Sequence, residues 1–410
     1  MTKEKSTVPR LRFPGFTDAW KQRKLGEVSK RVTRRNKELI SSLPLTISAQ
    51  HGLVDQEEFF NKQVASKDVS SYYLIKKGEF AYNKSYSNGY PWGAIKRLDR
   101  YEMGVLSTLY IVFKPTSLIC SDYLVSYYDT VNWYKEVSMI AAEGARNHGL
   151  LNIATNDFFK TRLFIPTLPE QEVIGSFFSD LDQLITLHQR KLDDVKELKK
   201  ALLQKMFPKG NGNDFPELRF PEFTDAWKQR KLGEVLKERN ESRSPSADVP
   251  LVSFTVENGV TPKTERYNRE FLVRDENKKY KFTQLDDIVY NPANLKFGAI
   301  ARNKYGAAVF SPIYVTYGVL SEAHPLFVEL IVTSTNFIQR ALRYQEGTVY
   351  ERMAVKSFDL LRSEILLPTL PEQEAIGNFF SDLDQLITLH QRQLDHLKLL
   401  KKALLQQMFI

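Results

Sequence analysis

The sequence has a single cysteine, Cys120, among 410 residues. An intramolecular disulfide framework is therefore excluded, and one cysteine fits a reducing compartment, where it most simply serves as a small buried side chain. No run of apolar residues approaches the roughly 18 needed to cross a bilayer. Residues 1–10 also lack the apolar core of a signal peptide. We therefore expect a cytoplasmic protein with no membrane contact.

Several catalytic signatures are missing from the sequence. There is no Gly-Lys dipeptide, which excludes the GxxxxGK phosphate loop, and no GxGxxG. There is no Pro-Pro dipeptide, so the Asn/Asp-Pro-Pro-aromatic motif of amino-methyltransferases is absent. The six histidines are scattered and, with one cysteine, form no cluster with metal-ligand spacing. We expect no catalytic residue, no metal and no cofactor in this chain.

An internal duplication organises the sequence. Residues 11–28 and 218–235 differ at one position, Gly15 against Glu222, and residues 165–207 match residues 367–409 at 35 of 43 positions. The blocks between them, residues 29–164 and 236–366, are far more different from each other. We call the repeated segments the frames and the divergent blocks the first and second inserts. Two near-identical frames holding unlike inserts predict two equivalent halves.

The segment that closes each half has the pattern of a long helix. Thr167 can cap it, Pro169 suits its first turn, and apolar residues then follow at alternating steps of four and three, which is a heptad seam. A helix this long and amphipathic needs a partner, and its own copy is the economical one. We predict an antiparallel coiled coil whose seam includes Phe178, Leu181, Ile185 and Leu192 with Phe380, Leu383, Ile387 and Leu394.

The inserts have the pattern of mixed α and β structure, with short apolar runs broken by Gly, Asn and Pro. Both contain a Tyr-Asn pair followed by a loop and Gly-Ala-Ile, at residues 82–95 and 290–300. An apolar run follows in each, residues 105–113 and 308–316, which we predict to be one strand. The inserts thus share a fold, and the chain is predicted to be an α+β protein with two pseudo-symmetric halves.

Positive charge is concentrated in the inserts. The net charge of the whole sequence is +9. Lysine and arginine outnumber aspartate and glutamate by 18 to 13 in the first insert and by 18 to 16 in the second. Their loops interleave cations and amides with aromatic residues. Arg and Asn can read base edges, whereas Lys mainly neutralises phosphate. The alternative for each residue is that its aromatic ring packs under a loop or its charge is solvated.

As groups, these loop residues favour DNA binding. They are Lys84, Tyr86, Asn88, Tyr90, Trp92, Lys96, Arg97, Arg146, Asn147 and His148 in the first insert, and Asn294, Lys296, Phe297, Arg302, Lys304, Tyr305, Tyr350 and Arg352 in the second.

The duplicated layout, the Leu-Pro-Glu-Gln-Glu starts of the helices at Leu168 and Leu370, and the YNK…GAI and YNP…GAI segments together resemble the specificity subunit of type I restriction–modification enzymes. The resemblance covers essentially the whole chain. It implies that each insert is the core of a target recognition domain that reads one half of a bipartite, asymmetric DNA site. Pro292 in place of Lys84 marks a departure between the two loops.

The resemblance also implies a multisubunit partner set. Two modification subunits would methylate adenine with S-adenosylmethionine, and restriction–translocase subunits would cleave DNA with ATP and Mg²⁺, so these cofactors are expected on the partners. The domains expected are a first target recognition domain at residues 1–164, a spacer helix at 165–207, a linker at 208–217, a second recognition domain at 218–366 and a second helix at 367–410.

Two other classes of protein remain open. A stand-alone DNA-binding regulator with a coiled-coil core would also be basic and two-fold, but it would not need two divergent inserts. A structural coiled-coil adaptor explains the helices but not the basic inserts.

Overall fold

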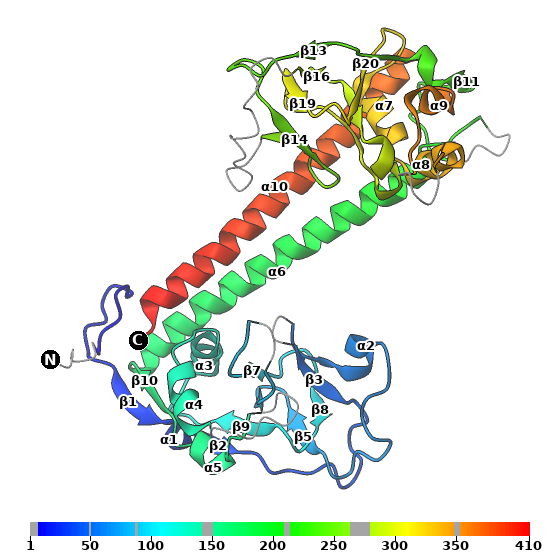
Figure 1. The fold of residues 1–410 in the computed structure, drawn as a ribbon. Helices are drawn as coiled ribbons and strands as arrows, with labels where there is room; N and C mark the ends of the chain where they lie inside the picture. The colour runs from blue at the N-terminus through cyan, green and yellow to red at the C-terminus, as the bar shows by residue number, and fades with distance from the viewer. Residues whose placement is uncertain are drawn as a thin grey trace. The chain divides into compact units, whose positions relative to one another are not determined.

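The computed structural model describes residues 7–48, 51–86, 89–141, 151–208, 214–262, 279–347 and 353–410. The chain forms two compact units, one of residues 1–190 with 391–410 and the other of residues 191–390 (Figure 1). This division cuts both spacer helices near their middle. Each unit therefore contains one insert, the start of one long helix and the end of the other. No helix in the described ranges combines the length and apolar character of a membrane span.

The first unit consists of short strands and helices before the long helix α6. Its elements are β1 (Lys21–Lys24), α1 (Leu25–Val28), β2 (Ser29–Arg31), β3 (Leu45–Ser48), β4 (Gly52–Asp55), α2 (Gln56–Phe60), β5 (Tyr73–Lys76), β6 (Phe80–Asn83), β7 (Ala94–Arg97), β8 (Met103–Leu106), β9 (Ile111–Pro115), α3 (Ser121–Tyr128), α4 (Tyr134–Ile140), α5 (Thr155–Phe158), β10 (Arg162–Ile165) and the start of α6 (Leu168–Lys205).

The second unit repeats this order closely. Its elements are β11 (Lys228–Lys231), η1 (Leu232–Glu234), β12 (Leu236–Glu238), β13 (Ser242–Arg243), β14 (Val252–Thr255), β15 (Gly259–Pro262), β16 (Tyr280–Thr283), β17 (Ile288–Tyr290), η4 (Pro292–Phe297), β18 (Ile300–Arg302), β19 (Ala308–Phe310), β20 (Val315–Val319), α7 (Pro325–Val332), α8 (Thr335–Ala341), η5 (Leu342–Tyr344), α9 (Ser357–Leu361), β21 (Glu364–Leu367) and the start of α10 (Leu370–Met408).

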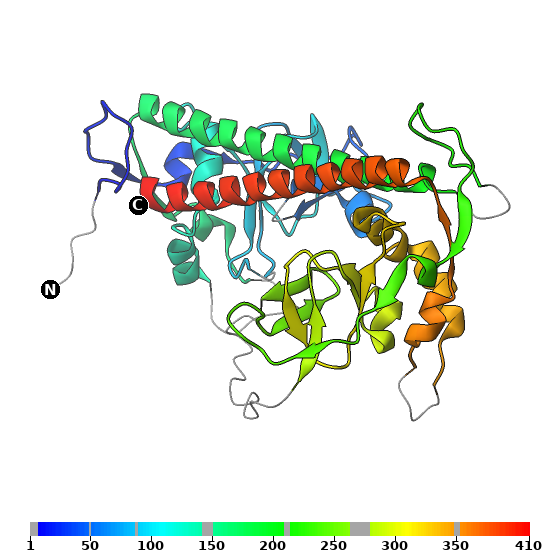
Figure 2. The same ribbon diagram turned by 90° about the horizontal axis from the view of Figure 1, so that it is seen from above.

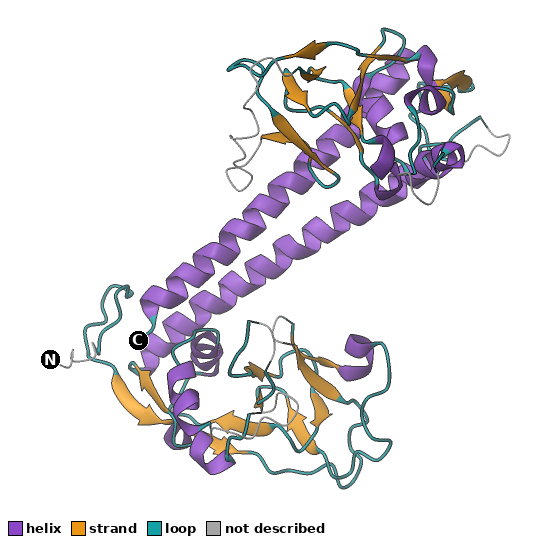
Figure 3. Ribbon diagram, viewed as in Figure 1, coloured by secondary structure: helices purple, strands orange, loops and turns teal. Residues whose placement is uncertain are grey.

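The central sheet has the same topology in both units. Its strand order is β2-β9-β6-β7 in the first and β12-β20-β17-β18 in the second, antiparallel throughout. Strands are orange in Figure 3. The register also matches, since Tyr82 faces Ile95 in one sheet and Tyr290 faces Ile300 in the other. Both tyrosines are fully buried. The predicted α+β class and the shared fold of the inserts are confirmed.

The prediction of one apolar strand at residues 105–113 and at 308–316 is wrong. Each run is divided between two strands, β8 and β9 in the first unit and β19 and β20 in the second. β8 pairs with β5 while β9 pairs with β2 and β6, and β19 and β20 divide their partners in the same way. An apolar run shows burial but not a change of sheet, so the turn between these strands was not predicted.

The long helices run antiparallel within each unit. In the first unit, Asp182 on α6 pairs with Lys401 on α10, and Gln189, further along α6, bonds Lys398, which precedes Lys401. The ribbons of α6 and α10 run side by side (Figure 2). In the second unit, Lys199 pairs with Asp384 at 2.5 Å. All eight predicted seam residues are buried or half-buried: Phe178, Leu181, Ile185, Leu192, Phe380, Leu383, Ile387 and Leu394. The predicted antiparallel pairing of the helices is confirmed.

The Glu-Gln of the Leu-Pro-Glu-Gln-Glu motif joins the frame to the insert. Glu170 is fully buried and accepts two hydrogen bonds from Arg12, in the repeated segment of residues 11–28, at 2.6 and 2.7 Å. The Gln171 side chain accepts from the backbone nitrogen of Cys120, at the start of α3, and donates to the carbonyl oxygen of Pro166. A buried carboxylate requires such a bidentate partner.

The second unit repeats the same joint. Glu372 binds Arg219 at 2.7 Å through both oxygens, and Gln373 accepts from the backbone nitrogen of His324. The motif is therefore structural in both halves.

Gly175 of α6 lies where the helix crosses the start of α3. A Cβ at this position would come within 2.6 Å of the Tyr123 backbone nitrogen and 2.9 Å of the Asp122 backbone carbon. Gly→Ala in a helix ordinarily stabilises by about 1 kcal/mol, but here the opposing atoms are backbone and cannot rotate away. We expect Gly175→Ala to destabilise the first unit by about 1–3 kcal/mol, as overpacking does.

Differential scanning calorimetry would measure the effect of Gly175→Ala, with Ser176→Ala as the control because Ser176 is the exposed neighbour on the same helix. Gly377→Ala should act likewise on the second unit, since its Cβ would lie 2.8 Å from Leu326 Cβ. An unchanged or raised Tm in Gly175→Ala would show that α3 can move away.

Candidate nucleic-acid interface

Two of the loops predicted to bind DNA occupy equivalent places in the central sheets of the two units. One joins β6 to β7, and the other, containing η4, joins β17 to β18. The asparagine of each Tyr-Asn pair turns the chain outward in the same way. The Asn83 side chain accepts from the backbone nitrogen of Ser85 at 3.0 Å, and Asn291 accepts from that of Ala293 at 3.1 Å. Pro292 at the first position of η4 favours a helical turn. The second loop is therefore helical where residues 84–86, the described start of the first loop, are not.

Each loop presents an exposed aromatic side chain. Tyr86 in the first is 60% exposed and Phe297 in the second is 64% exposed. The Lys296 ammonium lies 4.9 Å from the centre of the Phe297 ring, so a cation and a ring face are combined. Asn294 is exposed in the same turn. Exposed ring faces and amides beside cations suit contact with bases and sugars.

Other predicted residues of the first loop hold it in place. Lys84 donates to the carbonyl oxygen of Ile153 at 3.4 Å, and burial lowers the pKa of its ammonium. The carbonyl oxygen of Trp92 accepts from the hydroxyl of the buried Tyr82 at 2.7 Å, and the Trp92 ring packs on the core. Tyr90 is half-buried. These three residues therefore support the loop more than they extend from it.

Lys96 and Arg97 of β7 are paired with carboxylates of the protein. The Lys96 ammonium lies 2.7 Å from Asp129, and the Arg97 guanidinium lies 2.6 Å from Asp99 and 2.7 Å from Asp122. Burial acts to lower the pKa of Arg97, but these two carboxylates raise it above its ordinary value. In this structure the charge of Arg97 is already neutralised by these two carboxylates.

Asp129 belongs to a partly buried cluster of charges that reaches the helix seam. It bonds Lys401 as well as Lys96, each at 2.7 Å, and Lys401 also bonds Asp182. Burial acts to raise the pKa of the Asp129 carboxyl, yet the two ammonium groups hold it below its ordinary value. Burial likewise acts to lower the pKa of Lys401, and the carboxylates of Asp129 and Asp182 raise it. The cluster fastens strand β7 to the helix pair.

The second unit pairs its predicted cations differently. Arg302 bonds Glu329 at 2.8 Å and Asp286 at 2.5 Å, and Lys304 also reaches Glu329 at 2.8 Å. Lys304 is nevertheless more than half exposed, and Tyr305 beside it is 41% exposed. The structure thus brings together Lys304 and Tyr305 as accessible residues and places Arg302 in the interior.

The remaining predicted residues lie outside the described residues. They are Asn88, Arg146, Asn147, His148, Tyr350 and Arg352.

Sequence reasoning missed the carboxylates that neutralise the predicted cations. One of them, Asp99, was visible as a neighbour two positions after Arg97. Asp129 and Glu329 are far from their partners in the sequence and gave no signal. The described ranges contain no group of three His, Cys, Asp or Glu residues able to hold a metal ion.

The fold is that of a two-domain protein whose paired helices join two copies of one α+β domain, and known proteins share it. A crystal structure of the type I restriction–modification S subunit from M. genitalium superposes with a TM-score of 0.60 at 12% identity, covering 98% of this chain and 99% of that one. At this identity the likeness shows the fold alone.

The sequence is also similar to two curated proteins of Methanocaldococcus jannaschii. The putative type I restriction enzyme MjaX specificity subunit is 23% identical over 308 residues, which are 69% of this chain but 65% of that protein, just under two thirds of its length. The type I restriction enzyme MjaVIII specificity subunit is 21% identical over 315 residues, or 74% of this chain and 72% of that protein. No family model matches the chain. In sequence and in fold, the chain is similar to type I specificity subunits, and the predicted resemblance is confirmed.

Proposed function

We propose that this chain is the DNA-reading specificity subunit of a type I restriction–modification complex, and that each insert reads one half of a bipartite, asymmetric site. The main support is that both units contain the same sheet, and that the loop at the equivalent place in each sheet differs in sequence and conformation between the units. One docking geometry with unlike loops suits a protein that reads two unlike half-sites, since phosphate contacts position a protein and base contacts give specificity.

The proposal includes partner subunits that carry out the chemistry. We infer that two modification subunits with S-adenosylmethionine, and restriction–translocase subunits with ATP and Mg²⁺, act on the site that this non-catalytic chain selects. Exposed leucines at equivalent positions of both helices support two copies of one partner. Leu184 and Leu187 on α6 are 40% and 47% exposed, and Leu386 and Leu389 on α10 are 38% and 51% exposed. Repeated apolar exposure of this kind marks protein interaction surfaces.

The alternative is a stand-alone DNA-binding regulator with a coiled-coil core. Affinity purification of the tagged chain separates the two functions. A methyltransferase that co-purifies supports the specificity subunit, whereas RNA polymerase or self-association alone supports the regulator.

Alanine substitution of the exposed aromatic residues tests the DNA-reading function. We expect Tyr86→Ala to weaken recognition of one half-site and Phe297→Ala that of the other, each by about 1–3 kcal/mol, or roughly 5- to 150-fold. Methylome sequencing and binding to duplexes mutated in one half-site would measure this, at fixed salt because phosphate contacts depend on it.

The matched control for Tyr86→Ala is Arg97→Ala. Because Arg97 is paired with Asp99 and Asp122, its loss is expected to lower the Tm of the first unit more than it changes the target. A relaxed half-site with an unchanged Tm in Arg97→Ala would instead assign this residue to a base contact. Normal methylation in both Tyr86→Ala and Phe297→Ala would contradict the assignment of these loops.

A further inference from the structure

An exposed surface of the frames is unchanged between the two halves. Lys21 and Arg23 on β1 are exposed, as are their counterparts Lys228 and Arg230 on β11. Leu168 at the start of α6 is 40% exposed, and its counterpart on α10 is 44% exposed. Packing explains why buried residues such as Glu170 stay identical in both frames. It does not explain identical exposed residues in a duplication whose inserts have diverged.

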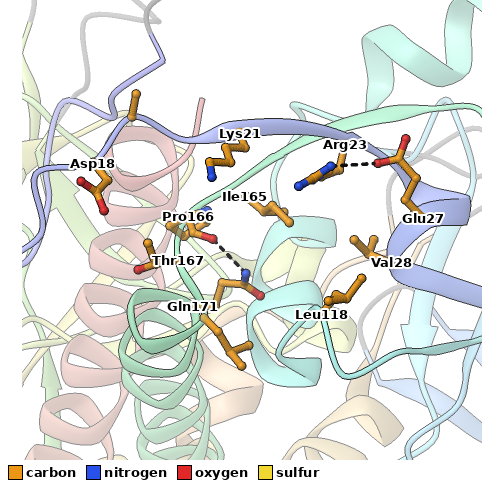
Figure 4. Close-up of a pocket in the computed structure, with 12 residues that line it drawn as sticks. Asp18, Lys21, Arg23, Glu27, Val28, Leu118, Ile165, Pro166, Thr167 and Gln171 are labelled. Carbon is orange, nitrogen blue, oxygen red and sulfur yellow. Dashed lines mark hydrogen bonds and ion pairs between the residues drawn. The ribbon is translucent and has the colours of Figure 1, made fainter.

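These exposed residues surround a pocket of about 680 Å³ in the first unit. Val28, Leu118 and Ile165 supply apolar walls, and the pocket lies between β1, the end of β10 and the start of α6 (Figure 4). Lys21 and Arg23 point toward it from β1, as residues two apart on a strand must do together. Ten of its twelve lining residues are identical in the second half, the exceptions being Leu118 and Ile165.

Lys21 and Arg23 can accept a further carboxylate at this pocket, which Asp18 and Glu27 also line. Within the described residues, no ion pair is found for Lys21, and the nearest carboxylate oxygen to Arg23 is that of Glu27 at 3.6 Å, with both side chains about half exposed. An exposed pair at this distance is weak, so Arg23 can exchange it for a better partner. In the second half Arg230 pairs with Glu234 at 3.1 Å, and both side chains are again about half exposed. Asp18 lies at the opposite end of the opening (Figure 4).

A protein segment suits this site better than a DNA backbone does. A phosphate backbone supplies charge but no side chain to cover the apolar walls at Ile165 and Leu118. An acidic peptide segment supplies both a carboxylate and an apolar side chain. Because the surface occurs once in each half, the partner that it fits is present in two copies.

We propose that the frame surfaces at Lys21 and Arg23 and at Lys228 and Arg230 each dock one copy of the same partner protein through an acidic, partly apolar segment. This deepens the proposed function, on which it rests, because the modification subunit is the partner inferred there to be present twice. A carboxylate of that partner lies between the lysine and the arginine, and an apolar side chain covers Ile165 or Leu367.

Native mass spectrometry of the full chain co-expressed with the modification subunit tests the proposal. We expect two copies on the unaltered chain, one on Lys21→Glu/Arg23→Glu, one on Lys228→Glu/Arg230→Glu and none on the chain carrying all four changes. The control is Lys24→Glu, which reverses one charge on the opposite face of β1 and should retain two copies. All substituted positions are exposed, and melting curves establish that the variants fold.

The outcomes separate this inference from the proposed function. Two copies on the fourfold variant would overturn the docking surface and leave the proposed function standing. No copy on the unaltered chain would overturn both. A fourfold variant that keeps both copies but loses affinity for every DNA sequence alike would assign the basic strands to phosphate contact and overturn the protein-docking surface.

Discussion

Exchanging residues 29–164 for the corresponding block of a related specificity subunit is expected to change one half of the methylated site and leave the other half and the spacer as they were. The contacts that join frame to insert explain why such an exchange should fold. The Gln171 side chain bonds the backbone nitrogen of Cys120, and the close approach at Gly175 is to the backbone of Asp122 and Tyr123. Because the frame contacts backbone atoms of its insert, which every sequence has, it tolerates many insert sequences.

The second unit shows that the same frame already holds an insert of different sequence. Gln373 bonds the backbone nitrogen of His324 in the same manner, although the residues around it are different. By the same comparison the Lys96–Asp129 pair is not needed for this fold, whereas the pair between the two helices is kept as Lys199 and Asp384. Ala301 follows Gly-Ala-Ile in the second unit as Lys96 does in the first, and Thr333 caps α7 as Asp129 caps α3.

Methylome sequencing of the exchanged chain gives the result directly, with an exchange of residues 236–366 as the reciprocal control. A change in both half-sites after a single exchange would contradict modular reading. Unaltered methylation at the original site would show that the insert does not read DNA at all.

The duplicated architecture could be predicted from the sequence because its signals are local or repetitive. The heptad spacing of Phe178 to Leu192 depends only on helix geometry, and the predicted positions are buried. Lys199 and Lys401 interrupt that apolar spacing. The structure supplies the reason, because each lies beside an aspartate of the other helix, Asp384 and Asp182. Lys199 is equivalent to Lys401 in the duplication, and Asp182 is equivalent to Asp384. The duplication and the antiparallel direction of the helices together would therefore have predicted both ion pairs.

The candidate site was harder to predict because it depends on long-range partners. Lys96 and Arg97 look like DNA-binding residues in the sequence. Yet Asp122 on α3 and Asp129, which caps that helix, approach them from more than twenty positions later. The sequence shows that a cation is present but not whether the fold has already neutralised it. Tyr86 and Phe297 are the reverse case, since only the structure shows that these aromatic rings remain outside the cores.

Phe178→Asp is expected to prevent the first unit from folding. The Phe178 side chain is 1% exposed, its ring centre lies 6.1 Å from that of Phe409, and the surrounding core includes Leu405 and Met408 from the end of α10. Loss of a buried phenylalanine costs about 3–5 kcal/mol. A carboxylate in its place adds the cost of burying a charge with no partner. The total approaches the whole stability of a typical domain, roughly 5–15 kcal/mol.

The second helix offers the reciprocal change, and the first helix offers the control. Phe380→Asp should act on the second unit, where Phe380 is equally buried and packs with Phe207 at 6.4 Å. Leu187→Asp introduces the same carboxylate on α6 at a 47% exposed position, so it should leave folding intact and reduce assembly with the modification subunit. Limited proteolysis with mass spectrometry, which reports each unit separately, would distinguish the three variants. A protease-resistant first unit in Phe178→Asp would mean that the end of α10 is not needed to complete that core, and the antiparallel seam would then be wrong.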